Sequence, residues 1–393
     1  MRYPGIVLVG CMTVLFLTAC AQQSSAPFEE RLENGVRVRA YTQPIPPVVN
    51  PYTVGDPITY GSGQSEETYL LSSAGFAGRL PDGVVLVTDL REGCLHRFAP
   101  DGRWLGSFGR PGPGPQEFGR FPQPVVVGDE ILVWVPANQR LLRFESGGTF
   151  LEGRHCEVRI GSAPVPVSGT AGSEYITLYS SLMMPYTGVE TATVRYGVFQ
   201  VNTELTRSDT LLYREGQGEG FWIGQGFNLQ PLQPLFPPWA VAPDRPLALG
   251  WTDRYRIDFI PLQGQDSLAV ELPLEGPLVT DEEKETEIAR YRRRGNEETA
   301  RRHLEFPDRK AAIRWMVWAG DGRLWVEDHT PVPGEEEGRH YNLFTAAGEW
   351  VASQVLPDRP AAVMGDGFYR NEENEAGEPV IRFYPFERTV RER

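Results

Sequence analysis

Residues 81–109 read PDGVVLVTDLREGCLHRFAPDGRWLGSFG, and the fold class can be inferred from this stretch. Two short apolar runs, 84–90 and 94–99, are bounded by the turns REG and Asp101-Gly102, and a third run, RWLGSFG, follows. Runs of this length between Gly-containing turns predict antiparallel strands. The apolar segment Gly75-FAGRL precedes them. The stretch therefore predicts a small antiparallel sheet of four short strands.

The same unit recurs along the chain. Residues 128–156 and 321–356 repeat it, and Trp104, Phe150 and Trp350 stand at the same step after the Gly turn. Four strands in roughly 40–50 residues is the size of a propeller blade. Short apolar segments precede six units, beginning at Gly75, Pro124, Pro164, Pro238, Ile313 and Ala361. The repeats predict an all-β protein, a six-bladed β-propeller.

Insertions interrupt this spacing. Units begin near Asp82, Asp129, Ser173, Asp244, Asp321 and Asp366, so the spacings are 47, 44, 71, 77 and 45 residues. One long interval contains residues 280–305, where Thr280 precedes Glu283 by three residues as in a capping box. Acidic residues lead and arginines follow, which suits a helix dipole. We expect a short, solvated helical insertion between the fourth and fifth blades, with a lid over the channel mouth as the alternative.

The last unit is short, because Asp366-GFYRNEE and Glu378-PVIRFYPF supply about two outer strands. A ring of blades must close or leave a raw sheet edge. The N-terminal region offers strands at Gly35-VRVRAY and Pro57-ITYG. We therefore expect N-terminal strands to complete the sixth blade.

The N-terminus carries an export signal. The apolar run at 6–19 has 14 residues, fewer than the roughly 20 needed to span a bilayer. It ends Leu17-Thr18-Ala19-Cys20, which resembles the lipobox of bacterial lipoproteins. That resemblance implies cleavage before Cys20 and a lipid on its sulfur. A secretory signal with a chance cysteine is the alternative.

These features divide the chain into three parts. We expect a lipoprotein signal peptide over residues 1–19, a lipidated flexible tether over 20–33 and the propeller over 34–393. Ala21 follows the cysteine, and by the lipoprotein sorting pattern this implies the outer membrane. The expected location is the cell envelope, with the lipid on Cys20 as the membrane contact.

Composition limits the partners. The chain has 38 Lys+Arg against 52 Asp+Glu, a net charge of −14, which argues against nucleic acid because phosphate binding needs a basic face. Nothing indicates a cofactor, and we expect a monomer. Cys94 and Cys156 remain in the folded domain, either as a disulfide or as two buried thiols. We expect no metal site, because His329 and His340 beside the acidic loop 333–338 are better interpreted as surface residues.

The segment VTDLREGCLHRFAPDGRWLGSFGRPGPGPQEF, residues 87–118, resembles the NHL-like six-bladed β-propeller lipoproteins of bacteria. The resemblance is strong over 80–150 and weaker over the rest of 34–388. It implies the fold and the surface anchor, and it implies no established reaction. The third and fourth blades lack the Asp-Gly turns of that pattern.

Four residues are candidates for ligand binding. Arg110, Glu117 and Glu219 lie in Gly-rich loops, Arg110-PGPGPQEF and Arg214-EGQGEGF, that are first of all blade-to-blade connections. Trp222 lies near the junction of blades three and four, where its ring could stack on a sugar or peptide.

The predicted function is binding or scaffolding of a peptide, glycan or partner protein at the channel face, without catalysis. The alternative is a cation-dependent hydrolase or lactonase that uses carboxylates at the channel mouth. Converging carboxylates would favour the enzyme, and an arginine-lined axis would favour binding.

Overall fold

The computed structural model describes residues 27–388 except 43–48, 64–68, 120, 159–161, 168–173, 184–190, 224–225, 230–231, 233–237, 244, 252, 263–265, 293–295 and 331–337. The predicted signal peptide and Cys20 lie outside the described residues.

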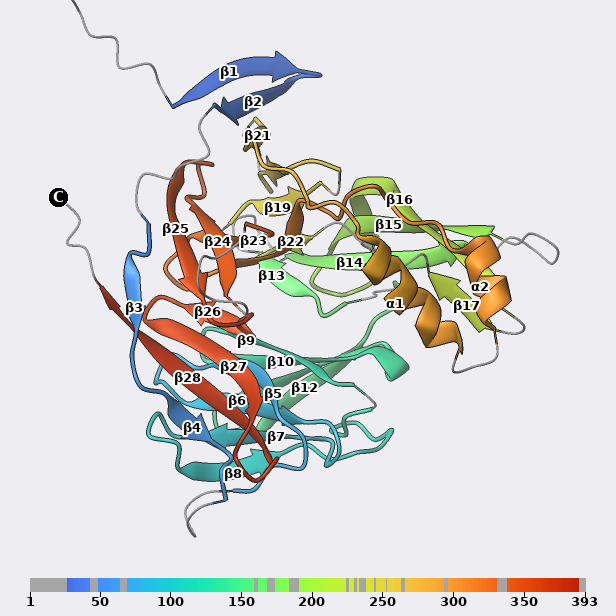
Figure 1. Cartoon of the computed structure of the whole chain (residues 1–393). Coiled ribbons are helices and arrows are strands. Elements are labelled where there is room, and N and C mark those ends of the chain that lie inside the picture. Colours follow the sequence, from blue (N-terminus) through green and yellow to red (C-terminus); the bar gives the residue numbers. More distant parts are fainter. Residues whose placement is uncertain are drawn as a thin grey trace, which may run out of the picture.

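Six sheets stand in a ring, so the predicted six-bladed propeller is confirmed (Figure 1). The first blade contains β5 (Gly75–Arg79), β6 (Val85–Asp89), β7 (Cys94–Phe98) and β8 (Trp104–Phe108). The second contains β9 (Gln123–Val127), β10 (Glu130–Val135), the 3₁₀ turn Pro136–Asn138, β11 (Arg140–Glu145) and β12 (Phe150–His155). The third contains β13 (Val165–Val167), β14 (Glu174–Met183), β15 (Thr191–Val201), β16 (Ser208–Ile223) and β17 (Gly226–Leu229).

The fourth blade contains β18 (Trp239–Ala240), β19 (Leu247–Gly250), β20 (Arg256–Ile260) and β21 (Leu268–Glu271). The fifth contains β22 (Ile313–Trp318), β23 (Leu324–Asp328), β24 (Arg339–Phe344) and β25 (Trp350–Leu356). The sixth contains β26 (Ala362–Met364), β27 (Gly367–Glu373) and β28 (Pro379–Arg388). First strands of neighbouring blades touch, β5 with β9, β18 with β22, and β22 with β26, so these strands lie nearest the axis.

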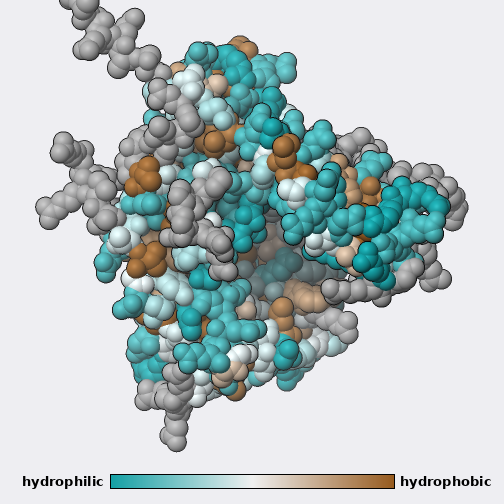
Figure 2. Space-filling view, viewed as in Figure 1, coloured by the Kyte–Doolittle hydropathy of each residue, from teal (hydrophilic) through white to brown (hydrophobic). Residues whose placement is uncertain are grey.

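The core lies between blades. In β6, Val85 and Val87 pack into a cluster shared with the sixth blade, whereas Leu86 packs into a cluster shared with the second. All three side chains are fully buried, and such burial stabilises the fold by about 1.5–3 kcal/mol per side chain. A middle strand buried on both faces explains why the decisive stretch is a continuous apolar run. Most of the surface seen in Figure 2 is hydrophilic. The same view shows a hollow near the centre of this face.

The N-terminal region closes the sixth blade as predicted. β3 (Tyr52–Val54) and β4 (Ile58–Tyr60) both pair antiparallel with β28. Tyr52 stacks on Phe386 with ring centroids 4.6 Å apart, and Tyr60 is 2% exposed. Residues 52–60 and the last strand, β28, are therefore held in one sheet.

The expectation that Gly35-VRVRAY joins the sixth blade was wrong. Its strand β2 (Val36–Tyr41) pairs parallel with β21 of the fourth blade, and β1 (Phe28–Glu33) adds outside it. Asn34 and Gly35 have φ of 51° and 82°, the pattern of the two-residue turn that joins twisted hairpin strands. Tyr41 is buried in the core of the fourth and fifth blades. Residues 28–33, assigned to the tether, are thus a strand.

The helical insertion is confirmed between β21 and β22 as α1 (Asp281–Arg292) and α2 (Glu297–His303). The capping box forms: the Thr280 amide donates to Glu283 Oε2 at 3.0 Å, and the Glu283 amide donates to Thr280 Oγ1 at 3.2 Å. Glutamates pair with arginines of the two helices, as in Arg301 with Glu285 at 2.7 Å. In the described part of the chain, no helix has the length and hydropathy needed to cross a membrane.

Candidate functional site

Glu327, near the end of β23, is a charged side chain with no exposed surface. Three guanidinium groups converge on its carboxylate. Arg359 donates to Oε2 at 2.6 Å, and Arg314 and Arg339 each approach Oε1 at 3.1 Å. We call Glu327, Arg314, Arg339 and Arg359 the arginine cluster.

Strand geometry assembles this cluster at one end of the fifth blade. Ile313 pairs with Asp328 and Trp315 pairs with Glu327, so Arg314 is the extra residue of a β-bulge in the first strand. Bulges bend a strand and re-aim a side chain. Arg339 begins β24, and Arg359 follows β25 in the connection to the sixth blade. The cluster therefore lies where the fifth blade passes to the sixth, with one member on the strand nearest the axis.

Positive charge is in excess around the cluster. Asp358 lies 3.6 Å from Arg339 and 3.0 Å from Arg370. Arg370 and Arg382 share a further carboxylate, Glu372, at 3.2 and 2.7 Å. Five arginines thus face three carboxylates, an excess of 5 − 3 = +2 in a chain whose net charge is −14.

Burial affects the ionisation of one member of the cluster, Arg314. Burial lowers the pKa of Arg314. The negative charge of Glu327 opposes this shift, and the positive charges of Arg339 and Arg359 add to it. Partly buried charge that is not neutralised by the protein is costly. An anion from solution would compensate it, and guanidinium groups bind carboxylate or phosphate through paired hydrogen bonds.

Tyr341 adds a neutral donor beside these charges. It pairs across the sheet with Glu327, it is fully buried, and its hydroxyl has no hydrogen-bond partner among the described residues. Burial raises the pKa of Tyr341, so the hydroxyl keeps its proton. A buried hydroxyl without a partner is rare enough to call for an explanation, and a bound anion would give it an acceptor.

His329 and His340 are not simple surface residues. His340 Nδ1 lies 3.1 Å from Asp328 Oδ1, and its side chain is only 14% exposed. Burial lowers the pKa of His329 to about 4, and the charges of Arg314 and Lys310 add to this effect. His329 is therefore neutral at pH 7, mainly because it is buried and in part because Arg314 lies nearby. The acidic residues of 333–337 lie outside the described residues.

Two of the four predicted ligand-binding residues come together. Arg110 Nε lies 2.8 Å from Glu117 Oε1, and the Gly114 amide donates to Glu117 Oε2 at 2.8 Å. That backbone hydrogen bond, with help from Arg110, lowers the pKa of Glu117. The Phe118 amide also donates to the Arg110 carbonyl at 2.8 Å. These contacts fold the loop on itself and support its interpretation as a blade connection.

The other two predicted residues lie elsewhere. Glu219 and Trp222 are on β16 of the third blade, where Glu219 pairs with Thr193 and Trp222 with Phe227. They are thus in a different sheet from the Arg110–Glu117 loop, and their side chains lie outside what the structure describes. Their role in ligand binding remains a prediction.

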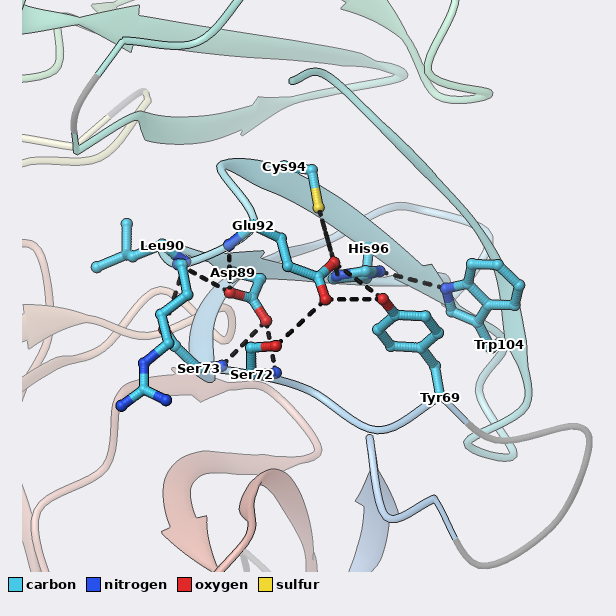
Figure 3. Close-up of polar contacts among 10 residues, drawn as sticks. Tyr69, Ser72, Ser73, Asp89, Leu90, Glu92, Cys94, His96 and Trp104 are labelled. Atoms are coloured by element: carbon cyan, nitrogen blue, oxygen red, sulfur yellow. Dashed lines mark hydrogen bonds and ion pairs between the residues drawn. The ribbon is translucent and has the colours of Figure 1, made fainter. Parts of the chain in front are cut away.

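A second cluster was not anticipated from the sequence. Glu92, Cys94 and His96 bring a carboxylate, a thiol and an imidazole together at the start of β7 (Figure 3). Cys94 Sγ and His96 Nε2 are 3.4 Å apart, and His96 Nε2 and Glu92 Oε2 are also 3.4 Å apart. The available signal was the alternation E-x-C-x-H, which places side chains on one face of a strand. The spacing E-x-C-x-H differs from zinc-binding motifs that lie on a helix, such as H-E-x-x-H.

This cluster does not have the charge state of a cysteine nucleophile. Burial, with Glu92 and Asp89 nearby, raises the pKa of Cys94 to about 12, and burial lowers the pKa of His96. Both groups are therefore neutral at pH 7. Cys94 and Cys156 are separate buried thiols, which answers the question that the sequence left open.

Among the described residues, Glu92, Cys94 and His96 are the one group of His, Cys, Asp or Glu side chains close enough to share a cation. Cys94 and His96 lie on the third strand of a blade, and Glu92 lies in the turn before it, away from the first strands near the axis.

The known proteins that this chain is similar to are solved structures of low sequence identity. No family model matches the chain, and no curated protein matches it significantly. A Bacteroides fragilis protein described as exported is 9% identical over 86% of this chain and 99% of its own, with a TM-score of 0.45. A DUF4221 member from Bacteroides vulgatus is 11% identical over 86% and 98%, with a TM-score of 0.44. A gluconolactonase from Xanthomonas campestris is 12% identical over 88% and 99%, with a TM-score of 0.37. All three TM-scores are below 0.5, so these similarities carry no argument about this chain.

Proposed function

We propose that the mature protein is an exported, lipid-anchored propeller of the NHL-like lipoprotein type that binds an anionic ligand at the arginine cluster. The observation that carries the binding function is the convergence of three guanidinium groups on the single buried carboxylate of Glu327. The lipobox-like ending at Cys20 supports the anchor. The ligand would be a peptide, glycan or partner protein that presents carboxylate or phosphate groups.

The chemistry of the cluster suits recognition better than turnover. Guanidinium groups stay charged at every physiological pH, so they hold an anion but do not exchange protons. Arg314, Arg339 and Arg359 have side chains 33%, 28% and 40% exposed. They are thus accessible to a ligand. The unpartnered Tyr341 hydroxyl would add a directional hydrogen bond.

The binding site is tested by calorimetric titration of the mature protein with trigalacturonate, a triglutamate peptide and inorganic phosphate. We expect at least one anion to bind, with affinity that falls as salt rises. The Arg359→Gln variant should bind it at least about tenfold more weakly, because a charged hydrogen bond contributes about 1.5–3 kcal/mol. The matched control is Arg103→Gln. The Arg103 side chain is 53% exposed, and its ion pair with Asp101 is a long one, at 3.9 Å.

The same titration followed by histidine NMR locates the anion. A bound negative charge offsets Arg314 and Lys310, so the pKa of His329 should rise from about 4 toward its usual value. The signal is assigned with His329→Asn. The proposal fails if none of the three anions binds, or if Arg359→Gln binds as tightly as the wild type.

The anchor has its own test. Cells that express the full chain are labelled with a fatty acid analogue, and membranes are separated from soluble fractions. Wild-type protein should carry the label and sediment with membranes, and Cys20→Ser should lose both properties because it lacks the acylated sulfur. Cys11→Ser, which changes the cysteine inside the predicted signal peptide, should behave as wild type. Unlabelled wild-type protein in the soluble fraction would contradict the proposed anchor.

A further inference from the structure

We propose that Glu92, Cys94 and His96 form a binding site for a single zinc-like transition-metal ion, with a fourth coordination position open to a water or a ligand. The three side chains belong to the turn after β6 and the start of β7 (Figure 3). Cys94 and His96 alternate along one strand and so share a face, and Glu92 in the turn places its carboxylate beside them. This site is separate from the arginine cluster on the fifth blade.

The distances within the cluster match those between the ligand atoms of one metal ion. N–H···O bonds in proteins are about 2.7–3.2 Å long, whereas His96 Nε2 and Glu92 Oε2 are 3.4 Å apart. Cys94 Sγ lies 3.4 Å from His96 Nε2 and 3.7 Å from Glu92 Oε2. Tetrahedral Zn²⁺ with bonds of about 2.3 Å to sulfur and 2.0–2.2 Å to nitrogen or oxygen sets its ligand atoms roughly 3.3–3.6 Å apart. The three atoms thus outline one face of a zinc tetrahedron.

Thiolate, imidazole and carboxylate are all ligands that Zn²⁺ accepts in proteins. The thiolate favours zinc, cobalt and similar ions over Mg²⁺ and Ca²⁺, which prefer oxygen ligands alone. A site with three protein ligands leaves the fourth position of a tetrahedron open. The Glu92 side chain is 33% exposed, whereas His96 is 1% exposed. We therefore place the entry path and the open position on the Glu92 side.

The surroundings hold the carboxylate ligand in place. The Tyr69 hydroxyl donates to both Glu92 oxygens, at 2.8 and 2.9 Å, and Ser72 Oγ donates to Oε1 at 3.2 Å. Asp89 fixes the turn, since its Oδ1 accepts from the Arg91 and Glu92 amides at 2.9 and 3.0 Å. Outer-shell hydrogen bonds of this kind orient metal ligands and raise metal affinity.

Trp104 makes a distinctive prediction about this site. Its indole Nε1 donates to His96 Nδ1 at 3.3 Å, so the neutral imidazole carries its proton on Nε2. A metal on Nε2 displaces that proton, and the neutral ring must then carry it on Nδ1, which faces another N–H donor. The Cys94 thiol gives its proton to solvent when the sulfur binds, so one proton is released per metal ion. The Trp104 indole must therefore move away from His96 when metal binds.

The position of Trp104 at the surface permits that movement. Trp104 stands on the outer strand β8 and is 37% exposed. It stacks on Tyr69 with ring centroids 5.0 Å apart. Indole fluorescence should therefore change on metal binding, and Trp104→Phe should bind the metal more tightly because it removes the opposing donor while keeping an aromatic ring.

The test uses the untagged mature protein, stripped with a chelator, dialysed, and titrated with Co²⁺ alone. We expect one Co²⁺ per chain, a near-ultraviolet thiolate-to-cobalt band and visible bands of tetrahedral strength, all displaced by Zn²⁺. Cys94→Ser and His96→Asn should each weaken binding about 100-fold or more, and Cys94→Ser should abolish the thiolate band. Cys156→Ser removes the other buried thiol and should bind as wild type. Thermal melts confirm that each variant is folded.

Two further outcomes decide the proposal. Tighter binding by Trp104→Phe, with loss of the metal-induced fluorescence change, supports the predicted imidazole rearrangement. Absence of a thiolate band in the wild type, or a band that survives in Cys94→Ser, overturns the site. Loss of anion binding at the arginine cluster would leave this result unchanged, because the two sites share no residue.

Discussion

Replacing Glu327 by glutamine is expected to lower the free energy of unfolding by about 3–5 kcal/mol, the usual cost of removing one partner from a buried ion pair. The amide has nearly the same volume, so packing is kept and only the charge is lost. Arg314, Arg339 and Arg359 would then face one another without their shared carboxylate. Because these arginines are partly exposed, they can turn toward water, and the lower end of the range is expected.

Urea unfolding followed by fluorescence measures this loss, with an unchanged slope as evidence that the native state is intact. Glu130→Gln is the matched control. Its carboxylate also binds an arginine, Arg143 at 2.8 Å, but its side chain is 40% exposed, so a loss within about 1 kcal/mol is expected. Equal losses for the two variants would contradict the special role of Glu327. Sulfate should stabilise Glu327→Gln more than wild type, because the variant has one more uncompensated positive charge.

The sequence was informative where structure depends on local pattern. Blade number follows from repeated turns and apolar runs, and the helix start at Thr280 follows from side chains three residues apart. The aspartates that close similar strands also have a local explanation, because Asp89 and Asp328 accept hydrogen bonds from amides of the turns that follow. Such features need no knowledge of distant contacts.

Pairing between distant segments was harder to predict. The strand containing Tyr41 and the strand containing Tyr60 are both short, N-terminal and alternating, yet one joins the fourth blade and the other the sixth. The choice rests on tertiary contacts, such as the Trp350 amide that donates to the Tyr41 hydroxyl at 2.8 Å. The Asn34-Gly35 turn was a missed local signal, and it would have placed a hairpin at residues 28–41.

The arginine cluster could not be assembled from the sequence. Its members come from three strands and one connection, and the positive excess exists only after the acidic residues have been distributed elsewhere by folding. Arg314 reaches Glu327 because of a bulge, which has no reliable sequence signal. The cluster of Glu92, Cys94 and His96 differs, because its members lie within five residues and stand at every second position. That local pattern can be seen in the sequence.

Removing β3 and β4 is expected to abolish cooperative folding, whereas removing β1 and β2 should only lower stability. A chain that begins at residue 62 lacks Tyr52 and Tyr60, which are 5% and 2% exposed, and leaves the β28 edge open. Loss of one large buried ring costs about 3–5 kcal/mol. Typical domains have a free energy of unfolding of roughly 5–15 kcal/mol. The loss of two rings and of the strand pairing is therefore large enough to unfold a domain in the lower half of that range.

A chain that begins at residue 43 separates the two contributions. It loses Tyr41 and the ion pairs of Arg31 and Glu33 with the fourth blade, but it keeps the closure of the ring. Thermal melts followed by circular dichroism should show a cooperative transition at lower temperature for this chain and none for the chain that begins at 62. A synthetic peptide of residues 49–63 should restore a transition to the shorter chain, because strand pairing with β28 can form in trans. A cooperative melt of the shorter chain without the peptide would show that the ring does not need these strands.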